Sequence, residues 1–188
     1  NSSMGSIAVV EGEEEEDLRC DSVNQEPLRV LVVDDSRINL KIMANILCKA
    51  NMEVTSVDSG GLLLQKLLGD HWLDYDVILL DWMMPGMDGI TACRLLRKRI
   101  ACDLLPVMFL TAKTEPADIT KAFGAGATDF ATKPFNRYEV VARTVSLGQA
   151  ARRARARYHD SIPIVAKDSF WKMQPMHPCA KPPAPQQD

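Results

Sequence analysis

The stretch VILLDWMMPGMDG, residues 77–89, decides what kind of fold this chain adopts. It opens with four consecutive apolar residues, and this run stops at Asp81. A short, continuous apolar run is typical of a strand that is buried on both faces of a sheet. Pro85, Gly86 and Gly89 follow, and these residue types favour a tight loop. We therefore predict a buried strand that ends in a carboxylate and leads into a shaped loop.

Further strand patterns lie on both sides of this stretch, and helical patterns separate them. The other predicted strands are residues 29–34, 53–57, 106–110 and 128–131. Apolar residues recur at helical spacing after Ser36, a good N-cap residue, and in residues 62–68, 89–99, 118–125 and from 136 onward. Five strands that alternate with five helices predict an α/β fold. Right-handed βαβ units would form a doubly wound, five-stranded parallel sheet with helices on both faces.

Polar side chains stand where the predicted strands end, namely Asp34, Asp35, Asp81, Thr111 and Lys133. Any one of them alone would be an ordinary solvated strand end. Together they should converge, because the functional crevice of such a sheet lies beyond the carboxyl ends of its strands. Close carboxylates repel each other unless a cation lies among them, and Mg²⁺ suits such oxygen ligands, with Mn²⁺ as an alternative. A carboxylate beside this cation can act as the nucleophile toward a phosphoryl group.

Four strings carry a resemblance to a known family. They are VLVVDDSRIN (residues 30–39), VILLDWMMPGMDG (77–89), PVMFLTAK (106–113) and GATDFATKPF (126–135). All four, in this order, resemble the signatures of the response-regulator receiver domains of two-component and phosphorelay signalling. The resemblance covers residues 28–148 and implies a flavodoxin-like fold with strand order 2-1-3-4-5.

The resemblance also implies a role for each matching residue. Asp81 would be the phosphorylation site, and the metal ligands would be Asp34, Asp35, Asp81 and the main chain of Met83. The residues that would bind the phosphoryl group or act in the switch are Thr111, the main chain of Ala112, Lys133 and Phe130. Those that would shape the neighbouring loops are Pro85, Gly86, Gly89 and Pro134, with Lys133–Pro134 as a cis peptide bond.

These roles predict a signalling phosphoacceptor rather than an enzyme. A histidine kinase or a histidine phosphotransfer protein would donate the phosphoryl group to Asp81. Thr111 would then move toward this group, and Phe130 would pack into the space that it leaves. The surface of the fourth helix, fifth strand and fifth helix would change and signal to a downstream protein or to a second copy in a homodimer. Met83 and Lys113 cannot activate a water molecule well, so we expect slow self-dephosphorylation.

Two alternatives and two architectures stay open at this point. A pseudo-receiver would bind proteins without phosphorylation, but it would lack an acid, Thr111 or Lys133, and none is missing. An aspartyl-phosphate hydrolase of similar topology would carry its nucleophile after the first strand, not the third. The receiver could stand alone or be part of a hybrid histidine kinase or a multidomain regulator. Asn39, within DDSRINLKI, resembles the pattern of hybrid-kinase receivers and favours the second architecture.

The flanking regions differ from the receiver in composition. We expect residues 1–27 to be a disordered acidic tail, because Glu11 and residues 13–17 are acidic, and residues 161–188 to be a disordered proline-rich tail. Residues 149–160 contain four arginines and favour an extended helix or linker. Five scattered cysteines favour reduced thiols and a cytoplasmic location. The sequence disfavours membranes and nucleic acid as partners.

Overall fold

The computed structural model describes residues 26–68, 71–113 and 115–161, with side chains up to Tyr158. Apart from residues 26, 27 and 161, the tails predicted to be disordered lie outside this described part of the chain. The strands are β1 (Arg29–Val33), β2 (Glu53–Val57), β3 (Val77–Asp81), β4 (Val107–Thr111) and β5 (Asp129–Thr132). The helices are α1 (Arg37–Lys49), α2 (Gly60–Lys66), α3 (Gly89–Arg97), α4 (Pro116–Gly124) and α5 (Arg137–Ser161), with a 3-10 turn, η1, at His71–Asp74.

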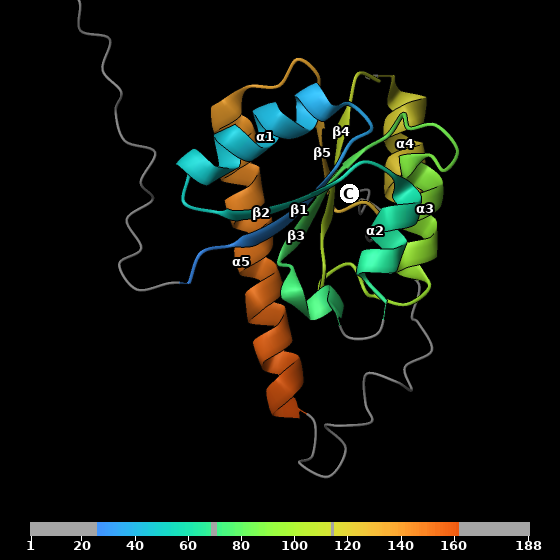
Figure 1. The fold of residues 1–188 in the computed structure, drawn as a ribbon. Coiled ribbons are helices and arrows are strands. Elements are labelled where there is room, and N and C mark those ends of the chain that lie inside the picture. Colours follow the sequence, from blue (N-terminus) through green and yellow to red (C-terminus); the bar gives the residue numbers. More distant parts are fainter. Residues whose placement is uncertain (1–25, 69–70, 114, 162–188) are drawn as a thin grey trace, which may run out of the picture.

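All five strands form one parallel sheet in the order β2-β1-β3-β4-β5. Helices α1 and α5 cover one face of this sheet, and α2, α3 and α4 cover the other (Figure 1). The predicted flavodoxin-like architecture and strand order are therefore confirmed. The turn η1 is an addition that the hydrophobic pattern did not predict, and it leads the chain from α2 into β3.

The strand residues alternate between two apolar cores, one on each face of the sheet. In β3, Ile78 and Leu80 pack with the α2–α4 side, and Val77 and Leu79 pack with the α1–α5 side. Every residue of β3 is buried, as expected for a strand with helices on both faces. The central strand is thus held by apolar burial on both sides, and Asp81 is fixed at its carboxyl end.

Side chains cap the helices that start next to the sheet edge. The Asp88 carboxylate accepts a hydrogen bond from the Thr91 backbone N–H at 2.8 Å and so starts α3. The Ser36 hydroxyl accepts one from Asn39 N–H at 3.4 Å at the start of α1. Each such cap stabilises a helix by about 1 kcal/mol. The Ser36 cap follows β1 and the aspartates after it, and the Asp88 cap follows β3, which ends at Asp81. Both caps therefore help to fix the loops around these carboxylates.

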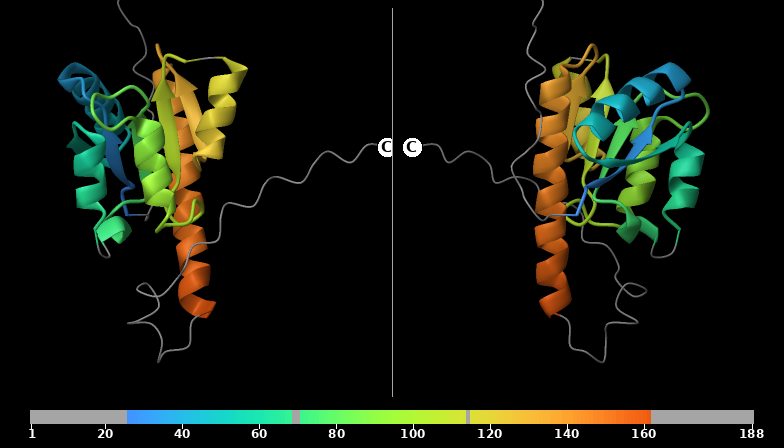
Figure 2. Two further views of the ribbon diagram at one scale, coloured as in Figure 1. Left: turned by 90° about the vertical axis from the view of Figure 1, so that its right-hand side faces the viewer. Right: turned by 60° about the vertical axis from the view of Figure 1, so that its left-hand side comes forward.

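Helix α5 is much longer than the other helices, with 25 residues. Its first half packs against the sheet, and its second half continues past the edge where the strands begin (Figure 2). Gly148 lies where α5 passes Leu28, and a Cβ at this position would approach a Leu28 methyl group to 2.9 Å. The absence of a side chain therefore lets the helix approach the chain just before β1.

Candidate functional site

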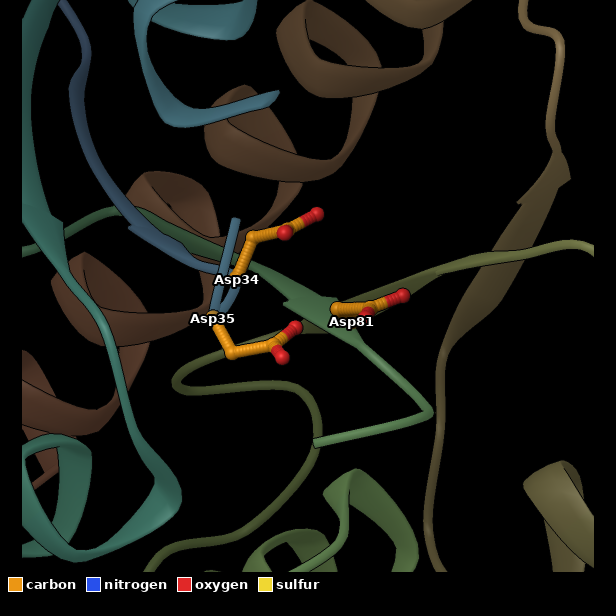
Figure 3. A group of neighbouring side chains, drawn as sticks. All are labelled: Asp34, Asp35 and Asp81. Carbon is orange, nitrogen blue, oxygen red and sulfur yellow. The ribbon is translucent and has the colours of Figure 1, made fainter. Parts of the chain in front are cut away.

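Three carboxylates lie together at the carboxyl edge of the sheet. Asp34 and Asp35 follow β1, and Asp81 ends β3, the neighbouring strand (Figure 3). One oxygen atom from each of the three lies within 4.8 Å of the others. A group of hard oxygen atoms at this separation fits Mg²⁺, which is typically held by one or two carboxylates plus waters and phosphate. The donor atoms present therefore suit the metal that the sequence predicts.

Asp34 is the most constrained of the three acids, with an exposed fraction of 2%. Its Oδ1 accepts hydrogen bonds from Ser36 N–H at 2.9 Å and from Asn39 Nδ2 at 3.1 Å. The Asn39 amide also donates to Oδ2 at 3.1 Å. In the sequence, Asn39 stands out only through its resemblance to hybrid-kinase receivers. The structure shows that it orients the carboxylate of Asp34 from the first turn of α1.

Lys133 joins two of the acids through its ammonium group. Its Nζ donates to Asp34 Oδ2 at 2.8 Å and to Asp81 Oδ1 at 2.9 Å. Burial opposes the charged form of Lys133, but these hydrogen bonds outweigh it and raise the lysine pKa. The Lys133–Pro134 peptide bond is cis. Three acids with one lysine still leave a negative surplus, which a divalent cation would offset.

Asp81 is buried, and this burial is the main reason that its pKa is raised above the usual range. Hydrogen bonding and attraction from Lys133 lower the pKa, whereas the nearby Asp34 charge raises it. The net effect is an Asp81 carboxylate that is costly to keep ionised without an added cation. Such a group is suited to bind a metal and to react with an electrophile.

Thr111 ends β4 and is buried next to this group. Its hydroxyl oxygen accepts a hydrogen bond from Lys113 N–H at 3.0 Å, which leaves the hydroxyl proton available to a further acceptor. Ala112 follows directly and is exposed, so its main chain lies at the rim of the site. The structure thus brings Thr111, Ala112 and Lys133 to the same sheet edge as the acids.

The loop after Asp81 is shaped by the glycines that the sequence singled out. Gly86 has φ +77°, a backbone conformation that side chains disfavour. A Cβ on Gly89 would collide with the Asp81 carbonyl oxygen and approach the Phe109 ring to 2.9 Å. Pro85 is exposed on this loop, and the Met83 side chain is 62% exposed beside the acids. Gly89 therefore lets the loop pass close to the end of β3, and Gly86 lets it adopt a left-handed backbone conformation.

Two contacts near the site were not predicted. The Lys113 ammonium lies 5.5 Å from the centre of the Trp82 ring and 3.7 Å from an Asp118 carboxylate oxygen on α4. Trp82 itself packs at 5.6 Å against Phe109 of β4. Lys113 is thus tied to the residue that follows Asp81 and to α4. Only the position of Trp82 next to Asp81 could have suggested this contact from the sequence.

Phe130 lies on β5, away from the carboxylates and beside α4. Its ring meets the edge of Phe123 at a centroid distance of 6.0 Å and an angle of 81°. Phe130 is half-buried, and Phe123 is 46% exposed. The structure therefore adds an aromatic partner, Phe123, to the residue that the sequence proposed as a switch.

Among the described residues, no helix combines the length and the apolar character needed to cross a bilayer. Cys48, Cys93 and Cys102 form no disulfide.

Comparison with curated proteins gives relatives over the same part of the chain. The chain is 39% identical over 119 residues to the transcriptional regulatory protein ResD of Bacillus subtilis, which covers 63% of this chain and 47% of ResD. It is 36% identical over 135 residues to the DNA-binding response regulator MtrA of Mycolicibacterium paratuberculosis, which covers 72% of this chain and 54% of MtrA. The chain thus spans about half the length of these relatives. MtrA is named as DNA-binding, so the relatives do not support our expectation that nucleic acid is not a partner.

Solved structures and a family model give the same result. The receiver domain of Francisella response regulator 1452 matches with a TM-score of 0.59 and 30% identity, over 65% of this chain and 97% of that chain. The chemotaxis protein CheY4 of Vibrio cholerae matches with a TM-score of 0.57 and 27% identity, over 64% of this chain and 98% of that chain. The model of the response regulator receiver domain matches residues 30–145. The chain belongs to the response regulator receiver domain family of two-component signalling.

Proposed function

We propose that this chain accepts one phosphoryl group on Asp81 and signals through the surface formed by α4, β5 and α5. The arrangement around Asp81 carries this proposal. Its carboxylate lies in a group of three within 4.8 Å and accepts a hydrogen bond from Lys133 at 2.9 Å. A nucleophilic carboxylate, two further acidic ligands and one ammonium group are the parts that phosphoryl transfer to an aspartate requires.

In the proposed step, a carboxylate oxygen of Asp81 attacks the phosphorus atom of a donor phosphohistidine. A new P–O bond forms, and the P–N bond breaks with its electron pair left on the donor imidazole. Mg²⁺, held by Asp34, Asp35, Asp81 and the Met83 carbonyl, would offset charge on the phosphoryl oxygens when bound. The product is an acyl phosphate on Asp81, and the donor is a histidine kinase or a histidine phosphotransfer protein.

The other side chains of the site bind the transferred group. Lys133 gives up one of its two carboxylate contacts and pairs with a phosphoryl oxygen, which adds a charge-assisted hydrogen bond. The Thr111 hydroxyl donates its proton to a second oxygen, and the Ala112 N–H donates from the rim. These three groups lie at the ends of β4 and β5, so binding of the phosphoryl group pulls on this part of the sheet. A cytoplasmic location belongs to the same proposal.

The signal would leave the site through Thr111 and Phe130. When Thr111 moves toward the phosphoryl group, it leaves space between β4 and α4. Phe130 then leaves its edge contact with Phe123, at 6.0 Å in this structure, and packs inward. The surface of α4, β5 and α5 changes its apolar content, and a downstream protein or a second copy of the chain reads this change.

Phosphorylation with a small donor tests the proposal directly. The protein is incubated with Mg²⁺ and acetyl phosphate, and intact mass and released phosphate are followed with time. We expect one acid-labile adduct that requires Mg²⁺ and is absent from Asp81→Asn. Continuous phosphate release would instead support a hydrolase, and an unmodified protein would support a binding module. Asp103→Asn, an exposed acid before β4, is the matched control and should form the adduct.

A further inference from the structure

The second half of α5 is fixed to the domain by a buried carboxylate. Asp76 directly precedes β3, at the opposite end of this strand from Asp81, and has an exposed fraction of 0%. Its Oδ2 accepts from Arg152 Nη2 at 2.7 Å, and its Oδ1 accepts from Arg155 Nη2 at 2.6 Å. Arg29 adds a backbone hydrogen bond at 2.9 Å and a guanidinium at 3.6 Å. We call Asp76 with Arg29, Arg152 and Arg155 the arginine clamp.

The arginine clamp carries more positive than negative charge. Three guanidinium groups face one carboxylate, and the side chains of Arg29 and Arg152 remain 40% and 27% exposed. Arg153 is exposed on the same helical segment, and residues 149–158 contain no acidic side chain. Arg29 and the second half of α5 therefore present a positively charged surface, and Asp76 neutralises only part of its charge.

The N-terminal segment of the chain enters the domain at this surface. Arg152 Nη1 donates to the Glu26 carbonyl at 2.6 Å, and Nη2 donates to the Pro27 carbonyl at 2.6 Å. Glu11 and residues 13–17 are acidic, and the last of them stands only nine residues before Glu26. Nine residues reach up to about 30 Å, whereas the helix from Arg152 to Tyr158 is only about 9 Å long.

We propose that the acidic run of residues 11–17 docks on the positively charged surface formed by Arg29 of β1 and by Arg152 and Arg153 of α5. The run carries six acidic side chains, and its tether begins on Arg152 itself. Single exposed ion pairs contribute little, but a tether of this length gives an effective concentration in the millimolar range. Several weak pairs formed at that concentration hold the run in place at low salt, and added salt screens them.

When it is docked, the acidic run competes with external polyanions for these arginines. The run places carboxylates where the phosphates of a nucleic acid would otherwise bind the same arginines. The surface lies at the edge of the sheet where the strands begin, far from Asp81. This inference is independent of the phosphorylation proposed above, and neither depends on the other being correct.

The test compares the whole protein with a variant in which the run is neutral, with Glu11 and Glu13–Glu16 changed to Gln and Asp17 to Asn. Backbone amide and arginine Nε–H NMR signals are recorded in 20 mM and in 500 mM NaCl, without any added ligand. At low salt, we expect the neutral variant to shift signals of Arg152, Arg153 and Arg155 relative to the native chain. These differences should vanish at high salt, and signals of Thr111 and Lys133 should not change. Superimposable α5 spectra at low salt would overturn the proposal.

A second arm uses a duplex DNA of arbitrary sequence as the polyanion probe. At low salt, we expect the neutral variant to bind this probe at least several-fold more tightly than the native chain. Adding Arg153→Gln should reverse this gain, and Lys41→Gln, an exposed change on α1, should leave it. Equal binding by the native chain and the neutral variant would contradict docking of the run on this surface. A gain that Arg153→Gln leaves intact would contradict the assigned surface.

Discussion

Two buried aspartates stand at the two ends of β3, and their surroundings are opposite in charge. Asp76 precedes the strand and has three arginines around it, whereas Asp81 ends the strand beside two more acids and one lysine. Burial opposes ionisation at both. At Asp76, hydrogen bonds from Arg152 and Arg29 and the charges of two arginines outweigh burial and lower the pKa; at Asp81, burial prevails and the pKa is raised. A buried carboxylate that is paired with several cationic side chains stabilises the fold. One that lacks this compensation is suited to bind a metal ion and to react with an electrophile.

The largest expected difference between the two aspartates is in phosphorylation. Asp81→Asn should abolish the acetyl phosphate adduct completely, because it removes the carboxylate that we propose as the nucleophile. Asp76→Asn should leave the initial rate of adduct formation within about twofold at a temperature where it is folded, since it lies at the far end of β3. Intact-mass measurements over time check both. An adduct on Asp81→Asn would show that another residue is the acceptor.

The next largest effect is on the free energy of unfolding. Here the change at Asp76 should matter more than the change at Asp81. Asp76→Asn should lower the free energy of unfolding by about 3 kcal/mol, because breaking a buried ion pair leaves arginines without their partner. Asp81→Asn should leave stability equal or higher, since it removes one of three close carboxylates. Urea denaturation followed by circular dichroism measures both, with exposed Asp103→Asn as the control. A loss below about 1 kcal/mol at Asp76 would mean that the arginine clamp is not a main stabilising contact.

Acidification should change the stability contributions of the two carboxylates in opposite directions. The lowered pKa of Asp76 means that its contribution is fully present above the unfolded pKa of about 3.9 and is lost as pH falls through the folded pKa. The raised pKa of Asp81 means that its ionised form destabilises the fold, and this penalty disappears as pH falls through that pKa.

Denaturation in EDTA between pH 7 and pH 3 measures these effects. The stability gap between the native chain and Asp76→Asn should narrow by up to about 1.4 kcal/mol per pH unit once Asp76 begins to protonate. The stability advantage of Asp81→Asn over the native chain should also shrink, because Asp81 of the native chain becomes protonated and no longer destabilises the fold. Parallel curves for all three proteins would contradict the assigned protonation states.

Magnesium should stabilise the protein through the carboxylates at the Asp81 end of β3, and this stabilisation should not depend on Asp76 at the other end. At ten times its Kd, Mg²⁺ should raise the free energy of unfolding by about 1.4 kcal/mol, as any ligand of the folded state does. Asp76→Asn should keep this increment, and Asp35→Asn should lose most of it because Asp35 lies in the carboxylate group. Thermal melting with and without Mg²⁺ measures this. An increment that survives Asp35→Asn would place the ion elsewhere.

The smallest expected effect concerns the lifetime of the phosphoryl group. Met83 lies 62% exposed beside the site and cannot orient a water molecule. Met83→Asn offers an amide that can, so self-dephosphorylation should become a few-fold faster, which corresponds to about 1 kcal/mol in the barrier. Decay of the adduct after removal of acetyl phosphate measures this. An unchanged lifetime would show that Met83 does not control the attacking water.

Much of the carboxyl edge of the sheet could be predicted from sequence, because the predicted site residues there stand at or just after the ends of strands. The apolar runs of β1, β3 and β4 lead to Asp34, Asp81 and Thr111, and Lys133 follows the short strand β5. Parallel strands bring these ends to one edge of the sheet. Asn39, Trp82 and Phe123 could not be assigned in the same way. Their contacts depend on side-chain direction from a helix or loop, which strand periodicity does not specify.

The arginine clamp could not be predicted at all. Asp76 appeared in sequence only as the polar start of an apolar run, and its partners Arg152 and Arg155 lie 76 and 79 residues away. Sequence composition favoured an extended helix for residues 149–160, which α5 spans without a break, whereas the end of the receiver at residue 148 stays a prediction. Whether an arginine on that helix faces solvent or a buried acid depends on where α5 passes the sheet, and Gly148 and Leu28 set that position.

The sequence by itself determined the order of strands and helices, the family, and the acids and lysine at the carboxyl edge, because local hydrophobic patterns and strand ends encode them. Only the tertiary structure decided which charges meet. It placed one lysine between Asp34 and Asp81 and three arginines around Asp76. Charge balance in a buried site depends on neighbours from distant segments, and no local pattern records them.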